Sequence, residues 1–567
     1  MFNNIQEQIE QTQKQFEEDS QQIASISEST LLKILSHNKD TEYGKKYDFA
    51  KITNLKEFKQ IHPITKYNHY ESFIQRMFDG EENILSKDTP IFFARSSGTT
   101  SVSKQKLIPV TKSISYFPWS LLIQGAVHQA FPLIKESHLS LLIVHANGLE
   151  YKNQNGIRVG FASSAQLPEV MKKEPFPFIS PKEVFYITHN QTATYLHAFY
   201  ALKNPDILYI HSTFATAVLD FFRCIEENWQ KMVEDIRLGI ISNDYLVIDP
   251  EIKQKLSHEI EPSPQRAEEL LHLFEAGFKN IATRLWPNLQ YIRCLAGGTF
   301  SIYVEKCQPY IGNVPIYSAT YGGSEGLFGI NLWPGKHIAH FLPVPQERYT
   351  EYTPLTETTS PHPTTLEVYQ LKKGESYEVV MTHSNGFYRY RIGDIIKVID
   401  YYNELPIYEL VGRSGTLLDI AAERTTEEMS LWSINQAVES QYYDLIDFTT
   451  MIDFNYSPQR YLFFVELADY SQLSATQISQ LENTLSEELE KNLKIANSYY
   501  EIKRILNAID KAQVFLVQQG TFRTAVEILA AKGTPEIQIK IPRYARKPEL
   551  IKLIQENRIT TTNGFVT

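Results

Sequence analysis

Residues 91–111 read IFFARSSGTTSVSKQKLIPVT, and the rest of the fold is organised around this stretch. An apolar run from Ile91 to Phe93 stops at a cluster of hydroxyl residues around one glycine, and a second apolar run follows two lysines. The pattern predicts a strand, a polar loop and a second strand. Gly98 lets the backbone turn and approach a ligand closely. Successive backbone N–H groups, hydroxyls and a lysine suit a chain of phosphate oxygens.

The loop is rich in hydrogen-bond donors and in positive charge. Its hydroxyls and its lysines are Ser96, Ser97, Thr99, Thr100, Ser101, Ser103, Lys104 and Lys106. It is not a Walker P-loop, because that motif needs a second glycine at the position of Ser103. An ordinary solvated loop between two hairpin strands is the alternative interpretation of this segment.

The composition is that of a globular protein with more than one domain. The chain has 567 residues, of which 43% are hydrophobic and 21% are charged. Its net charge is −11 and it has no long basic block, which argues against nucleic acid as a partner. No apolar run approaches the roughly 18 residues of a membrane span, so we expect no membrane partner.

Three features of the sequence indicate where the protein is located and whether it binds zinc. Cys224, Cys294 and Cys307 form no CxxC pair, and a sparse odd set is not a disulfide framework. The chain begins MFNNIQEQIEQTQKQFEEDSQQ, which is polar and acidic, unlike a secretory signal. We therefore expect a cytoplasmic protein, and the histidine spacing gives no reason to expect zinc.

Periodicity and turn residues predict an α/β fold in two domains. The first, residues 1–417, is large, with sheets flanked by helices plus an antiparallel β region, and the second, residues 418–567, is a smaller α+β domain. The expected elements are helices over 5–36, over 55–78 with a break at His62-Pro63, and over 426–441 and 475–510, and strands over 139–146, 289–298, 314–332 and 460–467.

The segment YGGSEG begins at Tyr321 and combines turn residues with a carboxylate. The paired glycines Gly322 and Gly323 predict a sharp turn. Ser324 can donate to a phosphate, and Tyr321 offers an aromatic face for a base. Glu325 is favourable beside an anionic ligand only if a cation lies between them, and Mg2+ bridged by carboxylate and phosphate oxygens fits. A tight hairpin with an exposed glutamate is the alternative.

The segment YRYRIGD begins at Tyr388 and reads as a strand that ends in a carboxylate. In a strand, Arg389 and Arg391 point to one face and the tyrosines point to the other. Gly393 then turns the chain and presents Asp394. An aspartate that accepts hydrogen bonds from vicinal hydroxyls suits a ribose. An ordinary strand with cross-strand charge pairs is the alternative.

Taken together, the motifs resemble those of the adenylate-forming superfamily. The order and spacing of SSGTTSVSKQK, YGGSEG, YRIGD and GRSGTLLD carry this resemblance. Within the superfamily, the chain resembles the auxin-responsive Gretchen Hagen family of acyl acid amido synthetases, through LIPVT, GFYRYRIGD, RYLFFVEL, QQGTF at 518–522 and QIKIPR at 538–543. The resemblance covers nearly the whole chain, and it implies a mobile C-terminal domain with a hinge at Asp419.

The resemblance implies that ATP and Mg2+ bind at these motifs. The ATP-binding residues would be Ser96, Ser97, Gly98, Thr99, Thr100, Gly297, Gly298, Tyr321, Gly322, Gly323, Ser324, Asp394 and Arg413. Among them, the hydroxyl loop would line the phosphates, Tyr321 would pack on adenine and Asp394 would hold the ribose. Glu325 would hold Mg2+. Lys106 and Lys540 would be catalytic, with Lys540 reaching the α-phosphate region when the C-terminal domain closes.

The chain departs from the family pattern in two places. The family loop usually carries a glycine soon after the Ser-Thr cluster, where this chain has Val102 and Ser103. A β-branched valine resists positive φ, so this change bears on loop geometry. The Gly-Glu-Lys that follows the hinge in the family reads Ala422-Glu423-Arg424 here. Arginine keeps the charge of lysine but not its point geometry.

The resemblance implies a two-step reaction with a carboxylic acid and an amine, usually an amino acid, as substrates. The acid attacks the α-phosphorus of ATP to give an acyl adenylate and pyrophosphate. The amine then attacks the acyl carbon, forming an amide and releasing AMP. An acyl-CoA or carrier-protein ligase, and a non-catalytic protein that binds a nucleotide or acyl ligand, are the alternatives. We expect the acyl pocket between Tyr116 and Phe131 and around Leu141 to His145.

Overall fold

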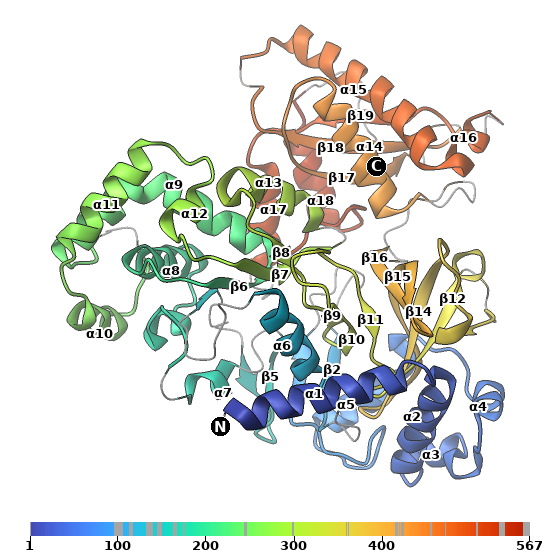
Figure 1. Cartoon of the computed structure of the whole chain (residues 1–567). Helices are drawn as coiled ribbons and strands as arrows, with labels where there is room; N and C mark the ends of the chain where they lie inside the picture. The colour runs from blue at the N-terminus through green and yellow to red at the C-terminus, as the bar shows by residue number, and fades with distance from the viewer. Residues whose placement is uncertain are drawn as a thin grey trace. The chain divides into compact units, whose positions relative to one another are not determined.

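The computed structural model divides the chain into two compact units. The described residues up to Leu410 form unit 1, and those from Val411 form unit 2. Figure 1 shows the elements of both units, which are treated separately below. The described residues are 2–95, 106–112, 117–131, 140–143, 150–162, 167–173, 176–242, 246–297, 300–358, 360, 362–413, 418, 420, 425–453, 456, 458–470, 472–505, 509–531 and 539–559.

Unit 1 begins with a group of helices. They are α1 (Phe2–Asp19), α2 (Ile23–Asn38), α3 (Glu42–Lys46), α4 (Leu55–Ile61) and α5 (Tyr67–Phe78). The side chain of Asn54 caps the start of α4 by accepting a hydrogen bond from the N–H of Glu57. The helix ends at Ile61 because Pro63 disfavours a helical conformation of the residue before it. The break expected at His62-Pro63 is therefore confirmed.

The strands on either side of the hydroxyl loop belong to one four-stranded sheet. Its order is β2 (Leu107–Val110), β1 (Phe92–Arg95), β5 (Arg158–Phe161), β4 (Tyr151–Lys152). β1 and β2 pair antiparallel, with Arg95 opposite Leu107. The predicted strand, loop and strand are thus confirmed for the two strands, while the loop lies outside the described residues. α6 (Trp119–Ala130) follows in the chain.

A second, parallel sheet forms the α/β part of unit 1. Its order is β3 (Leu141–Ile143), β6 (Tyr209–Phe214), β7 (Tyr291–Leu295), β8 (Ile316–Tyr317). Parallel strands are joined through helices, which cover the sheet. The helices of this part are α7 (Leu167–Met171), α8 (Asn190–Lys203), α9 (Ala215–Leu238), α10 (Pro250–Glu259), α11 (Pro264–Glu275), α12 (Ile281–Leu285) and α13 (Ser301–Ile311). In Figure 1, α9 lies between the sheet with β6 and β7 and the outer helix α11, which packs against α9.

Two antiparallel sheets complete unit 1. The smaller has the order β11 (Leu342–Pro343), β10 (Gly326–Ile330), β9 (Thr320–Gly323). The larger has the order β13 (Leu366–Glu367), β12 (Tyr349–Pro354), β14 (Ser376–His383), β15 (Phe387–Tyr402), β16 (Leu405–Arg413), the last of which runs into unit 2. Aromatic side chains from both sheets and from the N-terminal helices share one buried core. The antiparallel region predicted before Arg413 is confirmed.

Unit 2 has a three-stranded sheet with helices. Its order is β17 (Leu445–Asp453), β18 (Arg460–Leu467), β19 (Gln513–Leu516). The helices are α14 (Glu427–Glu439), α15 (Ala475–Ala496), α16 (Ser498–Ile505), α17 (Thr521–Ala530) and α18 (Pro548–Glu556). The core between β18, α17 and α18 consists of aliphatic and aromatic side chains. The predicted fold class, an α/β protein with an α+β C-terminal part, is confirmed, while the domain boundary predicted between 417 and 418 stays a prediction.

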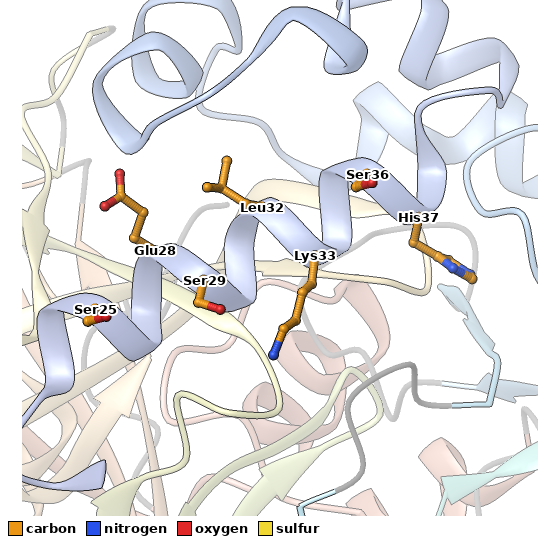
Figure 2. Close-up of a pocket in the computed structure, with 7 residues that line it drawn as sticks. All are labelled: Ser25, Glu28, Ser29, Leu32, Lys33, Ser36 and His37. Carbon is orange, nitrogen blue, oxygen red and sulfur yellow. The ribbon is translucent and has the colours of Figure 1, made fainter.

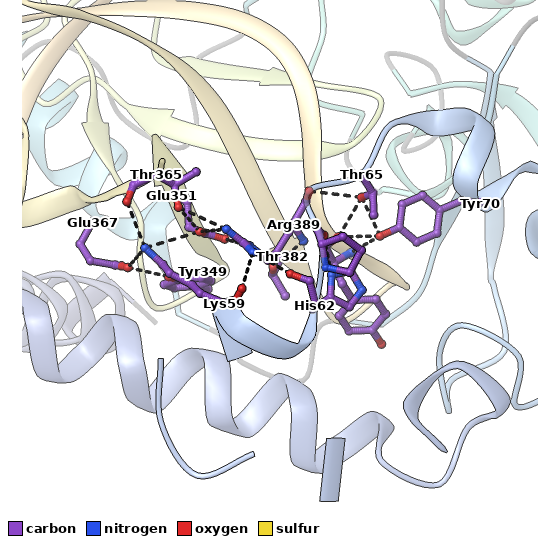
Figure 3. Close-up of polar contacts among 12 residues, drawn as sticks. Lys59, His62, Thr65, Tyr70, Tyr349, Glu351, Thr365, Glu367, Thr382 and Arg389 are labelled. Carbon is purple, nitrogen blue, oxygen red and sulfur yellow. Dashed lines mark hydrogen bonds and ion pairs between the residues drawn. The ribbon is translucent and has the colours of Figure 1, made fainter. Parts of the chain in front are cut away.

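A buried polar network ties the antiparallel sheet to the N-terminal helices (Figure 3). The guanidinium of Arg389 pairs with both carboxylate oxygens of Glu351, at 2.9 Å each. It also donates to the backbone carbonyls of Lys59 and His62, at 3.0 and 2.6 Å. Next to it, the backbone of Thr65 bonds to strand β15 through the carbonyl of Arg389. The guanidinium of Arg389 thus joins the antiparallel sheet, through Glu351, to the end of α4, through Lys59 and His62, and its role in the described fold is structural.

The structure corrects three local expectations. The turn of the YGGSEG hairpin lies at Ser324-Glu325, because Gly322 and Gly323 pair with β10 and belong to β9. The strand alternation expected at Arg389 fails, because that residue has φ +46° at a register shift between β14 and β15. Gly393 does not end the strand, since β15 continues to Tyr402.

Candidate functional site

The tip of the β9–β10 hairpin lies at the end of β1. Ser324 and Glu325 form the two-residue connection, and Gly323 pairs with Gly326 across it. The hydroxyl of Ser324 lies 3.5 Å from the backbone carbonyl of Arg95, the last residue of β1. Because Arg95 directly precedes the hydroxyl loop, the structure brings the YGGSEG turn to the point where that loop begins.

Tyr67 holds the other end of the loop. Its hydroxyl accepts a hydrogen bond from the N–H of Leu107 at 2.8 Å and donates to the carbonyl of Leu107 at 3.1 Å. The ammonium of Lys106 lies 5.5 Å from the centre of the Tyr67 ring. Burial raises the pKa of Tyr67 to about 12, and the negative charges of Glu71 and then Glu325 add to this rise. Lys106 therefore lies against Tyr67 at the end of the loop.

Tyr321 and Asp394 are in direct contact, although 73 residues separate them. The Tyr321 hydroxyl donates to the Asp394 carboxylate at 2.7 Å. The ring is only 4% exposed and packs against Phe328, Phe341 and Tyr408. Its described role in the site is thus to hold Asp394, and the packing of adenine on this ring stays a prediction.

A bulge in β15 presents Asp394. The strand pairs Arg391 with Val380 and Ile395 with Glu378, so three residues of β15 oppose one residue of β14. Gly393 takes up φ +85° within this bulge, which a residue with a side chain adopts only at a cost. Asp394 is partly exposed there. The glycine therefore has the presenting role expected of it, through a bulge and not through a strand end.

Arg389 and Arg391 are engaged elsewhere. Arg389 pairs with Glu351, and Arg391 pairs with the buried Glu378 on the adjacent strand. The interpretation of this segment as a strand with cross-strand charge pairs therefore holds for Arg391. The predicted presentation of Asp394 holds at the same time, because the charge pair and the presented carboxylate are different residues of the segment.

The remaining described residues of the predicted site lie in both units. In unit 1, Gly297 follows β7, and a Cβ atom at this position would lie 3.2 Å from the Cβ of Ala339. In unit 2, Lys540 is exposed and precedes a segment fixed to β17, where Thr450 bonds to Arg543 and Ala545. The side chain of Arg543 pairs with Asp447. The segment after Lys540 is therefore held rigidly within unit 2.

Several predicted residues fall outside the described part of the chain. They are Ser96, Ser97, Gly98, Thr99, Thr100, Gly298, the side chain of Arg413, and, among the departures and the hinge, Val102, Ser103, Asp419 and residues 422–424. The site assignments at these positions stay predictions.

One charged residue near the turn was missed by the sequence reasoning. Arg348 is 4% exposed, and its guanidinium lies 4.5 Å from the centre of the Phe328 ring and 3.5 Å from the carbonyl oxygen of Glu325. It immediately precedes β12 and belongs to no motif. Its burial depends on strands distant in the sequence, so no local pattern signals its place below the turn.

Two hollows on the surface of unit 1 are lined by other residues. One of about 750 Å³ follows a face of α2 (Figure 2), with Ser25, Glu28, Ser29, Leu32, Lys33, Ser36 and His37 along it. Its His37 is paired with Asp88 at 2.8 Å. A smaller hollow of about 230 Å³ lies between residues 308–316 and 335–338. No predicted site residue lines either hollow.

Comparisons with known protein families give one consistent result. The GH3 family N-terminal domain matches residues 12–316, the central domain matches residues 341–413, and the C-terminal domain matches residues 431–549. The chain belongs to the GH3 family. The Gretchen Hagen resemblance inferred from the motifs is therefore confirmed.

Relatives of known activity span almost the full length of this GH3 chain. A jasmonoyl–L-amino acid synthetase, JAR4 of Nicotiana attenuata, is 27% identical and covers 94% of this chain and 93% of its own. An indole-3-acetic acid-amido synthetase, GH3.4 of Arabidopsis thaliana, is 26% identical, over 96% and 93%. These names agree with the predicted enzyme class, an amide-forming ligase.

The solved structure of a family member has the same fold. The AtGH3.15 acyl acid amido synthetase in complex with 2,4-DB superposes with a TM-score of 0.81 at 24% identity, over 97% of this chain and 96% of its own. Likeness at this identity concerns the fold alone. The described helices include none that is long and apolar enough to cross a membrane.

Proposed function

We propose that this GH3 protein is an ATP-dependent acyl acid amido synthetase. It adenylates a carboxylic acid and then transfers the acyl group to an amine, with an amino acid as the expected acceptor. The observation that carries the proposal is the convergence of three distant motifs in unit 1. Ser324 reaches the end of β1, and Tyr321 of the same hairpin bonds to Asp394.

The residues present fit a polyanionic nucleotide with a divalent cation. The cation Lys106 and the hydroxyl of Ser324 border the hydroxyl loop, and Glu325 supplies a carboxylate beside them. The described residues hold no group of three or more His, Cys, Asp or Glu side chains placed to bind a metal. Glu325 is the residue that would hold a magnesium ion in this site. When bound, the ion would neutralise charge on the phosphates.

The first step requires positioning and charge neutralisation more than covalent help. The carboxylate oxygen of the acid forms a bond to the α-phosphorus of ATP, and the bond to the bridging oxygen of pyrophosphate breaks. Asp394, held by Tyr321, accepts hydrogen bonds from the ribose hydroxyls and so fixes the nucleotide. Lys106 lies where it can neutralise the phosphates, and Lys540 reaches the α-phosphate when the C-terminal domain, residues 418–567, closes about the hinge at Asp419.

The second step is aminolysis of the acyl adenylate. The neutral amine forms a bond to the acyl carbon, the bond to AMP breaks, and the amine loses a proton. The acyl adenylate is a mixed anhydride from which AMP departs as a good leaving group, so the protein has chiefly to orient the amine and exclude water. Rotation of the C-terminal domain between the steps would exchange one set of groups for another. The substrates of the enzyme are small molecules, and we expect the protein in the cytoplasm.

The test is release of pyrophosphate with Mg2+ and ATP against a panel of aryl, indolyl and fatty acids. Each acid is assayed without acceptor, with pooled amino acids and with CoA. Turnover that rises only with amino acids is the expected result, and it also identifies the acid. Turnover that rises only with CoA would identify a thioester-forming ligase, which shares the adenylation step. ATP binding without release for any acid would identify a binding protein.

A further inference from the structure

Arg348 is a buried arginine whose charge has no counter-ion in the described structure. Its side chain atom Nε is buried without a hydrogen-bond partner. One terminal nitrogen lies 3.5 Å from the carbonyl oxygen of Glu325 and 3.6 Å from the sulfur of Met381. Among the described residues, no carboxylate oxygen lies within the 4.0 Å of an ion pair. The positive charge of Arg348 is thus stabilised mainly by the ring of Phe328 and by one long contact to a backbone carbonyl.

Comparison with other arginines makes this arrangement unusual within the protein. Three further arginines in the described residues are buried to a similar degree, and each pairs with a carboxylate: Arg266 with Glu269, Arg389 with Glu351 and Arg543 with Asp447. Burying a charge without a partner destabilises a fold by several kcal/mol. Burial lowers the pKa of Arg348 only to about 10, so the side chain stays charged at neutral pH.

The unpaired charge lies directly against the turn of the candidate site. Gly326 follows Glu325, and a Cβ atom at this position would lie 2.5 Å from a terminal nitrogen of Arg348. A glycine at 326 is therefore what allows the guanidinium to approach the backbone of the turn. The other groups that face Arg348 are Tyr321, Tyr408, His383 and Glu347, and His383 is neutral because burial lowers its pKa to about 3.

We propose that Arg348 is a positioning residue that holds the Ser324-Glu325 turn and attracts polyphosphate anions, ATP and pyrophosphate, to it. The contact between the guanidinium and the Glu325 carbonyl fixes the turn, and the positive charge of the guanidinium attracts an anion bound at the turn. The inference rests on the proposed function, because it assigns the missing counter-charge to the nucleotide. It explains why a costly unpaired charge lies at this place in the fold.

The test uses two variants of the full chain and one control. Arg348→Met removes the charge at similar volume, and Arg348→Lys keeps it. Lys373→Met removes an equal charge from an ion pair with Asp400 in which both side chains are exposed. Binding of ATP and of pyrophosphate is measured by calorimetry with Mg2+, and thermal unfolding is measured without ligand.

The expected result separates a functional role from a structural one. Arg348→Met binds ATP and pyrophosphate about tenfold more weakly, the scale of one charge acting over several ångströms at an effective dielectric of about 20. Its melting temperature equals or exceeds that of the wild type, because an uncompensated buried charge is gone. Arg348→Lys recovers most of the affinity, and Lys373→Met changes neither quantity.

Other outcomes overturn the proposal. Wild-type affinity for ATP and pyrophosphate in Arg348→Met, or a clear fall in its melting temperature, would assign Arg348 to structure. A raised KM for the acid with unchanged ATP affinity would assign the charge to the substrate carboxylate. The proposed function is tested separately, since wild-type protein that binds ATP but adenylates no acid would refute the enzyme reaction while leaving the Arg348 affinities interpretable.

Discussion

Replacing Arg389 by methionine is the perturbation whose cost the structure defines most fully. Arg389 is 6% exposed and Glu351 is 1% exposed, so the ion pair is almost wholly removed from water. The substitution deletes two bonds to Glu351 and the bonds to the carbonyls of Lys59 and His62. Breaking a buried pair by removing one partner costs about 3–5 kcal/mol, because the other charge is left uncompensated.

Two contacts place the expected loss near the lower end of this range. The carboxylate of Glu351 keeps the ammonium of Lys59 at 3.5 Å and the hydroxyl of Thr365 at 2.5 Å. The remaining carboxylate is therefore partly compensated. We expect Arg389→Met to lower the free energy of unfolding by about 3 kcal/mol. Residue 389 has a left-handed φ, which is a strained conformation for a residue other than glycine. In the wild type the contacts of the arginine side chain hold this conformation, and the variant keeps the strain without those contacts.

A double-mutant cycle isolates the pair itself. Glu351→Gln removes the stranded charge, so the double variant should lose less stability than the sum of the single losses, by about 2 kcal/mol. Urea unfolding followed by tryptophan fluorescence reports mainly unit 1, which contains Trp119, Trp229, Trp286 and Trp333. Lys373→Met, which breaks the exposed pair with Asp400, is the matched control and should leave the urea midpoint unchanged.

Additive losses in this cycle, or a cost below about 1 kcal/mol for Arg389→Met, would refute the reasoning. Either result would mean that the pair seen in Figure 3 repays only its own desolvation. The tie between the N-terminal helices and β15 would then rest on the backbone bonds of Thr65, which the substitution leaves in place.

Three further predictions concern activity and pH. Glu325→Ala abolishes Mg2+-dependent pyrophosphate release while circular dichroism stays that of the wild type, and full activity in the purified variant would disprove the metal assignment. Lys540→Ala lowers the rate of adenylate formation far more than the affinity for ATP, so equal losses would speak against domain closure. Burial lowers the pKa values of His62, His211 and His383 to about 3, below the 6.5 of an unfolded chain. Since the unfolded state then binds more protons, stability is complete above pH 6.5 and falls as the pH drops toward 3. Urea midpoints at pH 7 and pH 5 measure this, and a midpoint unchanged at pH 5 would contradict it.

Much of the fold could be predicted because local patterns and tertiary packing agree. The break at His62-Pro63 follows from the proline alone, and the strands around the hydroxyl loop follow from apolar runs that end at polar residues. Asp394 could be singled out because a glycine precedes it in a strand-like segment, although the bulge that presents it depends on the register with β14.

The hairpin turn shows why element ends are harder to predict. Both Gly322-Gly323 and Ser324-Glu325 are acceptable turn sequences, so local preference does not choose between them. The choice is made by space, because a Cβ atom at Gly322 would lie 2.9 Å from the carbonyl oxygen of Gly326. The glycines are thus required by the close pairing of β9 with β10, and the turn lies two residues further along the chain, with Ser324 and Glu325 at its tip.

Arg348 could not be predicted because its meaning lies in what surrounds it. In the sequence, Arg348 follows PVPQE and belongs to no motif, and an arginine in such a setting is ordinary on a surface. The fold buries it between β10 and β14, beside a glycine that leaves room for it, and no carboxylate of the described residues lies within ion-pair distance of it. The same protein pairs Arg389 so completely that every guanidinium bond described has a partner. The fold thus pairs the buried charge of Arg389 and leaves that of Arg348 without an ion pair at the turn of the candidate site. This difference argues that the charge of Arg348 acts on a ligand. Methionine at position 389 should lower the stability of the protein and methionine at position 348 should not, so the two variants test the argument directly.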